Sequence, residues 1–456
     1  MRASTGGLAA ARVCALLTGT VVLAGGCAAG EDDPATGSPD TSRPSPGGPR
    51  GGDGDGNDPP DDRPSGGFDN PDPDAGPPTT CGNDGGCAAG TVVGEAGDRV
   101  DLLFVVDDSH SMGEEQAALA SQFPRMLRKL VTGDHDEDGT AEFRPVTDLH
   151  LGIISSNLGV DYPVQRCEGR GDDGRLLHEV TVDSVTVGGS DATCTGPYPS
   201  FLVYDEASVT ADEIATQFAC IAVLGTDGCG YEAPLEAALK ALWPSGDNRI
   251  GFRPYGAVAQ TAHGDTHNAG FLRNAESDGP GTLAIVLVTD EDDCSVWDQA
   301  IFDPMPAMDD PLAQQHVNLR CFHNPDALYP IERYLSAYRG LYTDAGGRVV
   351  FAAIAGVPID LVDQPALAMV DFNNRTEREA HYQRILEDPR MQEQVDADRP
   401  GYLVPSCESG LGLAYPPRRI VELARRFGPD SLVQSICGDN LGPPIEIVVR
   451  QLASPL

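Results

Sequence analysis

Four short apolar runs constrain the fold of this chain more than any other feature. Each run is continuous, of strand length and rich in β-branched residues, as strands buried on both faces of a sheet are. Amphipathic helical patterns separate the runs, and strands that alternate with helices favour a parallel sheet covered on both sides. The runs are Arg99–Val106, Leu149–Ser155, Thr282–Thr289 and Val349–Ala355, and the helical patterns include Glu114–Val131, Thr210–Leu224 and Glu232–Trp243. The sequence therefore predicts an α/β fold with a doubly wound, mostly parallel sheet and helices on both faces.

Residues 1–27 have the pattern of an export signal. Arg2 and Arg12 precede an apolar core of about ten residues, which is shorter than the ~20 residues of a membrane-spanning helix. The small residues directly before Cys27 resemble the lipobox of bacterial lipoproteins. This resemblance implies cleavage before Cys27, lipidation of its sulfur and a lipid anchor in the cell envelope. We expect the outer membrane as the location, with ordinary secretion as the alternative.

Composition divides the rest of the chain in two. Residues 28–97 are rich in Gly, Pro and Asp and poor in large apolar side chains, which predicts a disordered acidic tether. Residues 98–456 are expected to form the folded domain. The chain has 31 Lys and Arg against 70 Asp and Glu, a net charge of −39. Because phosphate backbones need clustered basic residues, this charge excludes nucleic acid as a partner, and the membrane is expected to be contacted through the lipid anchor alone.

The cysteines point to disulfide bonds. Of the 12 cysteines, ten remain once Cys14 in the signal and Cys27 are set aside. An even number in an exported chain predicts disulfides, and the paired CxxC spacings of thiolate metal sites are absent. The sequence leaves the connectivity open. Pairing neighbours in order is one possibility, and it would give a small Cys81/Cys87 loop in the tether and short loops throughout the domain.

Oxygen-bearing side chains follow two of the apolar runs and precede one helical pattern. Asp107, Ser109 and Ser111 form a DxSxS motif after the first run, and Asp290 follows the run that ends at Thr289. Thr226 stands in a Gly-Thr loop ahead of the third helical pattern. Ligands bind at the carboxyl ends of the strands in open parallel sheets, and hard oxygens suit Mg²⁺, Mn²⁺ or Ca²⁺. A divalent-cation site is therefore expected there.

These three loops, in this order, resemble the von Willebrand factor A domain over roughly residues 98–450, and the chain resembles bacterial lipoproteins that carry such a domain. The resemblance implies a metal-ion-dependent adhesion site at the five positions just named, with one coordination position left for an acidic group of a partner. Two departures stand out. The long interval before Thr226 implies an insertion around residues 160–207, and Glu291 follows Asp290 where many members have Gly. The acidic run that begins at Glu291 is open to two readings, a second cation site or a solvated surface.

A second acidic pattern lies between the first helical pattern and the second run. It reads DxDxDG and resembles a calcium-binding loop, although Pro145 occupies the position at which an EF-hand needs Glu. A small structural Ca²⁺ site and an exposed acidic turn are the two interpretations. The residues concerned are Asp134, Asp136, Asp138 and Glu142.

Enzymatic patterns are weaker. A phosphatase of the haloacid dehalogenase type needs a second Asp where Ser109 stands, and the residues around His110 do not form a GxSxG nucleophile turn. His263 and His267 are four residues apart but lack the adjoining Glu of zinc proteases. We therefore expect that the chain is not an enzyme. We expect it to bind an acidic group of a protein or surface ligand through its cation. A secreted metal-dependent hydrolase and a structural envelope protein with a vestigial site are the alternatives.

Overall fold

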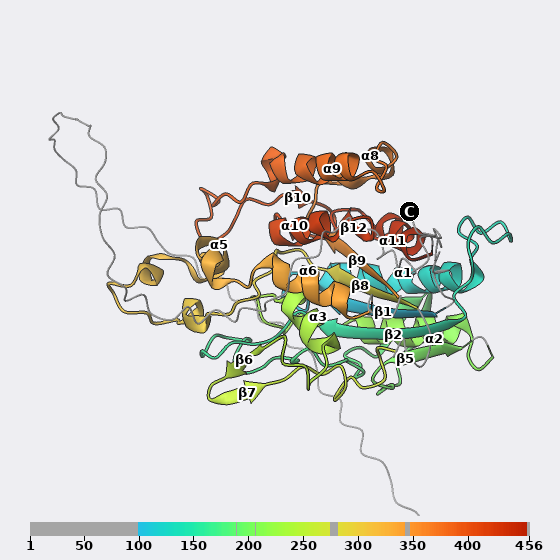
Figure 1. The fold of residues 1–456 in the computed structure, drawn as a ribbon, viewed down its shortest axis with the longest axis horizontal. Coiled ribbons are helices and arrows are strands. Elements are labelled where there is room, and N and C mark those ends of the chain that lie inside the picture. The colour runs from blue at the N-terminus through green and yellow to red at the C-terminus, as the bar shows by residue number, and fades with distance from the viewer. Residues whose placement is uncertain (1–98, 188, 206, 274–280, 343–346, 454–456) are drawn as a thin grey trace, which may run out of the picture. The chain divides into compact units, whose positions relative to one another are not determined.

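A six-stranded sheet forms the centre of the computed structural model, which describes residues 99–187, 189–205, 207–273, 281–342 and 347–453 (Figure 1). The strand order is β12-β9-β8-β1-β2-β5, and all neighbours are parallel except the edge strand β5, which runs antiparallel to β2. The strands are β1 (Arg99–Val106), β2 (Asp148–Ser155), β5 (Leu202–Asp205), β8 (Thr282–Val288), β9 (Arg348–Ala355) and β12 (Ser431–Ser435). The predicted α/β class and the mostly parallel sheet are confirmed.

The chain winds in two directions from β1. It first moves outward through β2 and β5, and then returns to the other side of β1 to add β8, β9 and β12. The winding direction therefore reverses between β1 and β8, which is where open α/β sheets bind their ligands. Val106, the last residue of β1, lies in register with Ser155 on one side and Val288 on the other. Three strands thus end together at one edge of the sheet.

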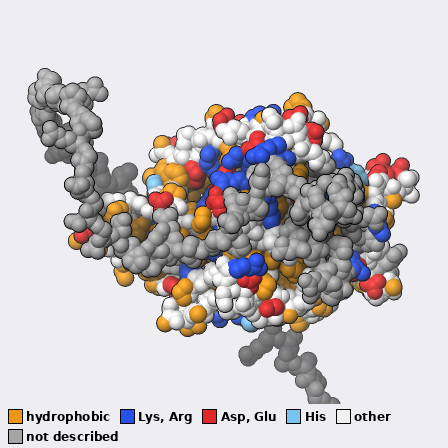
Figure 2. Space-filling view, in the orientation of Figure 1, with side chains coloured by type: hydrophobic (Ala, Val, Ile, Leu, Met, Phe, Trp, Pro, Cys, Tyr) orange, Lys and Arg blue, Asp and Glu red, His pale blue; other side chains and the backbone are white. Residues whose placement is uncertain are grey.

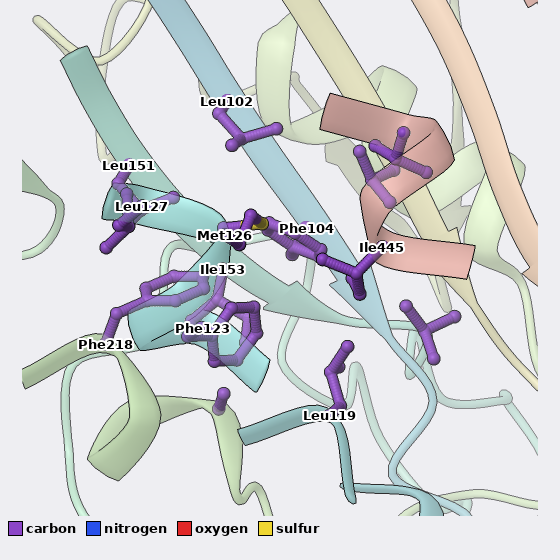
Figure 3. Packing of buried hydrophobic residues seen from close by; sticks show 14 of the residues in the cluster. Leu102, Phe104, Leu119, Phe123, Met126, Leu127, Leu151, Ile153, Phe218 and Ile445 are labelled. Carbon is purple, nitrogen blue, oxygen red and sulfur yellow. The ribbon is translucent and has the colours of Figure 1, made fainter. Parts of the chain in front are cut away.

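The two faces of β1 pack against different helices. Leu102, Phe104 and Val106 belong to a cluster with α1, α2 and α11, whereas Leu103 and Val105 belong to a cluster with α3, α6 and α10. This alternation is the period of two that a strand buried on both faces must have. Figure 3 shows Phe104 on the first face, among Phe123 of α1, Phe218 of α2 and Ile445 of α11.

The three helical patterns expected from the sequence are confirmed as α1, α2 and α3. These helices and the others are α1 (Gly113–Thr132), α2 (Ala211–Ala222), α3 (Pro234–Leu242), α5 (Arg320–His323), α6 (Ile331–Gly340), α7 (Ile359–Val362), α8 (Gln364–Leu367), α9 (Arg375–Glu387), α10 (Arg418–Phe427) and α11 (Gly442–Ala453). Three small hairpins lie outside the central sheet: β3 (Ser184–Val187) with β4 (Ser190–Thr193), β6 (Phe252–Tyr255) with β7 (Val258–Gln260), and β10 (Cys407–Glu408) with β11 (Leu413–Ala414).

Pairing cysteines with their neighbours in order is wrong for half of the described disulfides. The structure pairs Cys167 with Cys229 and, nested inside that loop, Cys194 with Cys220. The reason is that α2 packs on β3, so Cys220 meets Cys194 while Cys229 continues to Cys167. The pairs Cys294–Cys321 and Cys407–Cys437 do follow the neighbour order. The last part of the segment around residues 160–207, for which the sequence predicted an insertion, forms the edge strand β5 of the central sheet.

Several expectations fall outside the part of the chain that the structure describes. These are the signal at 1–27 with Cys27, the tether at 28–97 and the Cys81/Cys87 loop. Within the described residues, no helix combines the length and apolar character that crossing a bilayer requires.

Candidate metal centre

Asp107 lies at the carboxyl end of β1 and anchors a tight turn into α1. Its side chain is fully buried, with Oδ1 accepting the Ser109 N–H at 2.8 Å and Oδ2 accepting the Thr289 hydroxyl at 2.8 Å. The Ser109 and Ser111 hydroxyls are 3.2 Å apart. The DxSxS motif therefore gathers a carboxylate and two hydroxyls at the start of α1. Ser111 and its neighbour His110 are exposed, so this turn reaches solvent.

Gln116, in the first turns of α1, ties this turn to the loop that carries Thr226. Its Nε2 donates to the carbonyl oxygens of Asp107 at 2.8 Å and Gly225 at 2.9 Å, and its Oε1 accepts the Gly225 N–H at 3.1 Å. Gly225 has φ +92°, a left-handed conformation that favours glycine. Thr226 is half-buried, and its methyl group would lie 3.4 Å from a Cβ placed on Gly113. Gln116 thus holds Thr226 beside the start of α1.

Asp290 follows β8 and brings the third loop to the same edge. It is 1% exposed, and both of its carboxylate oxygens lack a well-formed hydrogen bond within the described structure. Burial raises the pKa of Asp290 well above its ordinary value, and the charges of Asp107 and Glu291 add to this rise. The Ser111 hydroxyl approaches the carboxyl and partly offsets the rise in pKa. Asp290 is therefore close to Asp107 and Ser111, and no Lys or Arg of the described residues forms an ion pair with it.

The five residues predicted from the sequence thus lie at one edge of the sheet. Asp107 and the two serines are joined by hydrogen bonds, Asp290 lies within electrostatic reach of Asp107 and Ser111, and Thr226 is connected to them through Gln116. The chain thus brings oxygen-bearing residues of three loops to one edge of the sheet, and hard oxygens are the ligands that a divalent cation takes.

Four further carboxyl groups surround this site, and of these the sequence singled out only Glu291, at the start of an acidic run that was open to two readings. Glu232 is 2% exposed, and burial together with the charges of Glu291 and Asp107 raises its pKa well above the ordinary value. Burial and the charge of Asp107 raise the pKa of half-buried Glu291 to about 7. Burial, with smaller contributions from neighbouring acids, likewise raises the pKa values of Asp108 and Glu115 to about 7.

The sequence carries little signal for the other three carboxyl groups. Glu115 sits in the first turn of α1, where an acidic side chain usually faces solvent and the helix dipole. Its burial follows from the approach of Gly412, whose Cβ, if it had one, would lie 2.4 Å from Glu115 Oε1. Asp108 is covered similarly, because a Cβ on Gly228 would lie 2.2 Å from its Cγ. Such contacts join parts of the chain that are far apart in the sequence, so no local sequence pattern predicts the burial of these carboxyl groups.

The six carboxyl groups form what we call the acidic centre: Asp107, Asp108, Glu115, Glu232, Asp290 and Glu291. Among the residues that the structure describes, no Lys or Arg forms an ion pair with any of them. Burying unpaired carboxylates is costly unless they bind protons or cations. The donor set, all oxygen and all acidic or hydroxylic, fits Mg²⁺, Mn²⁺ or Ca²⁺ rather than a soft metal.

The second acidic pattern also converges in space. Asp134, Asp136, Asp138 and Glu142 each offer a carboxylate oxygen, and these four atoms lie within 4.8 Å of one another. The loop follows α1 and is mostly exposed, and its carboxylates already accept backbone N–H groups, as Asp134 does from Gly139 at 2.8 Å. The arrangement suits a small Ca²⁺ loop and equally an acidic turn held by its own backbone.

Comparison with known proteins identified no relative of this chain. No family model, no curated protein and no solved structure matches the chain. The function therefore has to be argued from the geometry of the acidic centre.

Proposed function

We propose that this chain is an exported, lipid-anchored protein of the bacterial cell envelope that binds a divalent cation and, through it, an acidic group of a protein or surface ligand. The cation would be Mg²⁺, with Mn²⁺ or Ca²⁺ as substitutes, held by Asp107, Ser109, Ser111, Thr226 and Asp290. The observation that carries the proposal is Asp290, whose two buried carboxylate oxygens have no well-formed hydrogen bond in the described structure. A buried carboxylate in this state calls for a bound proton or a bound cation.

Two further features support the resemblance to von Willebrand factor A domains. The sheet is doubly wound, and the three loops meet where its winding reverses between β1 and β8. The hydrogen bonds of Gln116 and Thr289 join these loops to one another.

The residues have distinct roles in this proposal. Asp107 is oriented by hydrogen bonds to both of its oxygens, so it contributes charge from a stable position. Asp290 has two carboxylate oxygens without a well-formed hydrogen bond among the described residues, and these would contact the cation directly. Ser111 is exposed and marks the side on which a partner's carboxylate would approach. A bound cation would supply the positive charge that allows this carboxylate to come near the acidic centre. The chemistry is binding and requires no bond to be broken.

The proposal is tested by cation-dependent stability. We expect 1 mM Mg²⁺ or Mn²⁺ to raise the melting temperature of the wild type, because a ligand at about 100 times its Kd stabilises the native state by about 2.7 kcal/mol. Asp290→Asn should abolish this rise. Without cation it should melt no lower than the wild type, since the amide is neutral without having to bind a proton. Asp107→Ala should abolish the rise as well.

The matched control is Glu114→Gln, an exposed acid in the first turn of α1 that should keep the full response. Pull-downs from envelope extract, with and without chelator, would then compare the wild type with Asp290→Asn for a bound partner. Equal melting temperatures of the wild type with and without Mg²⁺, Mn²⁺ and Ca²⁺ would refute the proposal.

A further inference from the structure

Arg166 is a basic side chain beside the proposed cation site that the proposed function leaves without a role. Its Nη1 donates to the carbonyl oxygen of Thr226 at 3.2 Å, and its Nη2 lies 3.4 Å from the Asp227 carboxylate. The side chain of Thr226 is one of the proposed ligands of the cation. A positive charge therefore lies against a residue of the site, on the loop that a partner's acidic group would approach.

The Cys167–Cys229 disulfide bond holds Arg166 in this position. The bond joins the residue after Arg166 to the third residue after Thr226. The carbonyl oxygen of Cys167 also accepts the Val160 N–H at 2.6 Å, so the backbone on this side is tied down. Arg166 itself has φ +64°, a left-handed conformation that glycine adopts more readily than arginine. Unfavourable conformations of this kind cluster at functional sites, which directs attention to the Arg166 side chain.

The guanidinium of Arg166 can still bind a partner. Its side chain is 38% exposed, and the Asp227 side chain next to it is 96% exposed. An ion pair this open to water is weak, so a carboxylate from a partner can compete with Asp227. A guanidinium has five N–H donors, and the hydrogen bond to Thr226 uses one of them. Donors therefore remain for a carboxylate, which a guanidinium binds well through two N–H groups at once.

Arginines that pair within the fold have closer partners. Lys and Arg side chains gather over α9 and α10 in Figure 2. There, Arg425 lies 2.7 Å from Glu422 and 2.8 Å from Glu379. The contact between Arg166 and Asp227 is longer and involves a more exposed acid. Arg166 is therefore better placed to bind a partner than to support the fold.

We propose that Arg166 binds a second acidic group of the partner while the first acidic group binds the cation. This inference rests on the proposed function, because it requires a partner carboxylate at the cation. The partner would be a protein segment that carries two carboxylates close together. The acidic centre contains six carboxyl groups and repels such a segment, whereas one divalent cation supplies only two positive charges. Arg166 would add positive charge where the segment approaches and would favour paired acids over single ones.

Two synthetic peptides test the inference on the full-length chain loaded with Mn²⁺. The two-acid peptide is Gly-Glu-Gly-Glu-Gly and the one-acid peptide is Gly-Glu-Gly-Gln-Gly, both with blocked ends and a fluorescent label for anisotropy. We expect Arg166→Gln to raise the Kd of the two-acid peptide about three- to fivefold, by the strength of a partly exposed ion pair. The Kd of the one-acid peptide should stay nearly unchanged. Arg166→Lys keeps the charge but not the planar guanidinium, so it should restore part of the binding.

The matched control is Arg128→Gln, which removes the same charge from an exposed arginine near the other end of α1. It should bind both peptides as the wild type does. The Kd for Mn²⁺ without peptide distinguishes a contact role of Arg166 from a structural one. We expect Arg166→Gln to bind Mn²⁺ at least as tightly as the wild type, because a positive charge beside the cation is removed. Loss of a structural support would instead weaken Mn²⁺ binding.

The outcomes separate this inference from the proposed function. If wild type and Arg166→Gln bind the two-acid peptide equally, and chelator abolishes this binding, the role of Arg166 is wrong while the proposed function stands. If Arg166→Gln weakens Mn²⁺ binding and affects both peptides alike, Arg166 only supports the Thr226 loop, and the inference is again wrong. If neither peptide binds the wild type loaded with Mn²⁺, the inference and the proposed partner chemistry both fail.

Discussion

At the scale of single residues, Gln116 is the side chain that connects two of the three loops. It makes hydrogen bonds to the Asp107 carbonyl and to both backbone groups of Gly225, over a separation of 109 residues along the chain. Gln116→Leu keeps the volume but leaves these buried groups without partners. We expect a loss of about 2–4 kcal/mol of unfolding free energy, by the cost of unsatisfied buried polar groups. Urea denaturation measures this loss.

The cation affinity shows whether Gln116 also positions Thr226. We expect the Kd for Mn²⁺ to rise at least tenfold in Gln116→Leu, because the Thr226 loop would no longer be held beside α1. Gln122→Leu is the control, since Gln122 lies further along the same helix and its Nε2 donates to the hydroxyl of the neighbouring Ser121. A destabilised Gln116→Leu with an unchanged Kd would mean that Gln116 supports the fold and not the site.

His381 gives the protein a pH dependence that is independent of the acidic centre. It is buried against Phe372 and Tyr382, and burial, together with the nearby charge of Arg384, lowers its pKa to about 4. The unfolded value is about 6.5. Because the unfolded state then binds more protons, the stabilisation is complete above about pH 6.5 and is lost as the pH falls toward 4. At ~1.4 kcal/mol per pKa unit, the loss is roughly 3 kcal/mol.

Urea midpoints between pH 7 and pH 4.5 check this prediction. The wild type should lose stability relative to His381→Gln over this interval, since the variant lacks the titrating ring. The acids of the centre titrate equally in both chains, so the difference between the two isolates His381. His110→Gln, at an exposed position, should follow the wild type. Parallel curves for wild type and His381→Gln would show that the ring is not held neutral.

Residues differ in how far the sequence reveals their part in the centre. Asp107, Ser109, Ser111 and Asp290 were predictable, because each stands at the end of an apolar run and the spacing of the motif is local. The role of Glu232 was not predictable, because an acidic residue near the start of a helix is usually solvated. Its burial depends on loops after β2 and β8 that close over it, as the hydrogen bond from Cys294 N–H to the Glu232 carbonyl shows. Long-range packing of this kind leaves no pattern in a single sequence.

At the scale of elements, the central strands were predictable and the edges were not. β1, β2, β8 and β9 are continuous apolar runs, and the structure confirms each to within one residue. β5 (LVYD) alternates buried and exposed residues over only four positions, as an edge strand does. β12 (SLVQS) is buried throughout but is short and carries polar residues. Because runs this short resemble loop sequence, only pairing with a neighbouring strand identifies them.

The Cys167–Cys229 disulfide joins the excursion after β2 to the loop that carries Thr226. It closes a separation of 62 residues, within which Cys194–Cys220 is nested. Loop-closure entropy predicts a loss of about 3–4 kcal/mol when Cys167→Ala and Cys229→Ala are combined. We also expect weaker Mn²⁺ binding, because Cys229 lies three residues from Thr226.

The control for this prediction is the nested disulfide. Cys220 lies inside α2, which packs on α1, so the helix keeps its position without the bond. Cys194→Ala/Cys220→Ala should lose stability but retain the wild-type Kd for Mn²⁺. Equal affinities in both double variants would show that the Thr226 loop is held by its hydrogen bonds to Gln116 alone.

At the scale of the whole molecule, the strong negative charge and the expected tether bear on where the protein works. A flexible tether of this composition has a span of roughly 40 Å, which would hold the domain away from a membrane surface. A net charge of −39 opposes close contact with anionic lipid. Attachment to the envelope would then depend on acyl chains at Cys27, each buried CH₂ contributing about 0.8 kcal/mol.

Cys27→Ser tests this dependence in a bacterial host that makes lipoproteins. We expect the wild type to incorporate a labelled fatty acid and to sediment with membranes, and Cys27→Ser to lose the label and leave the membrane fraction. Cys14→Ser is the matched control: it removes a thiol from the same signal, upstream of the expected cleavage, and should keep both properties. If the Cys27→Ser chain still sediments with membranes without the label, the domain itself binds the envelope. A chelator should then release the chain if the acidic centre makes this contact through its cation.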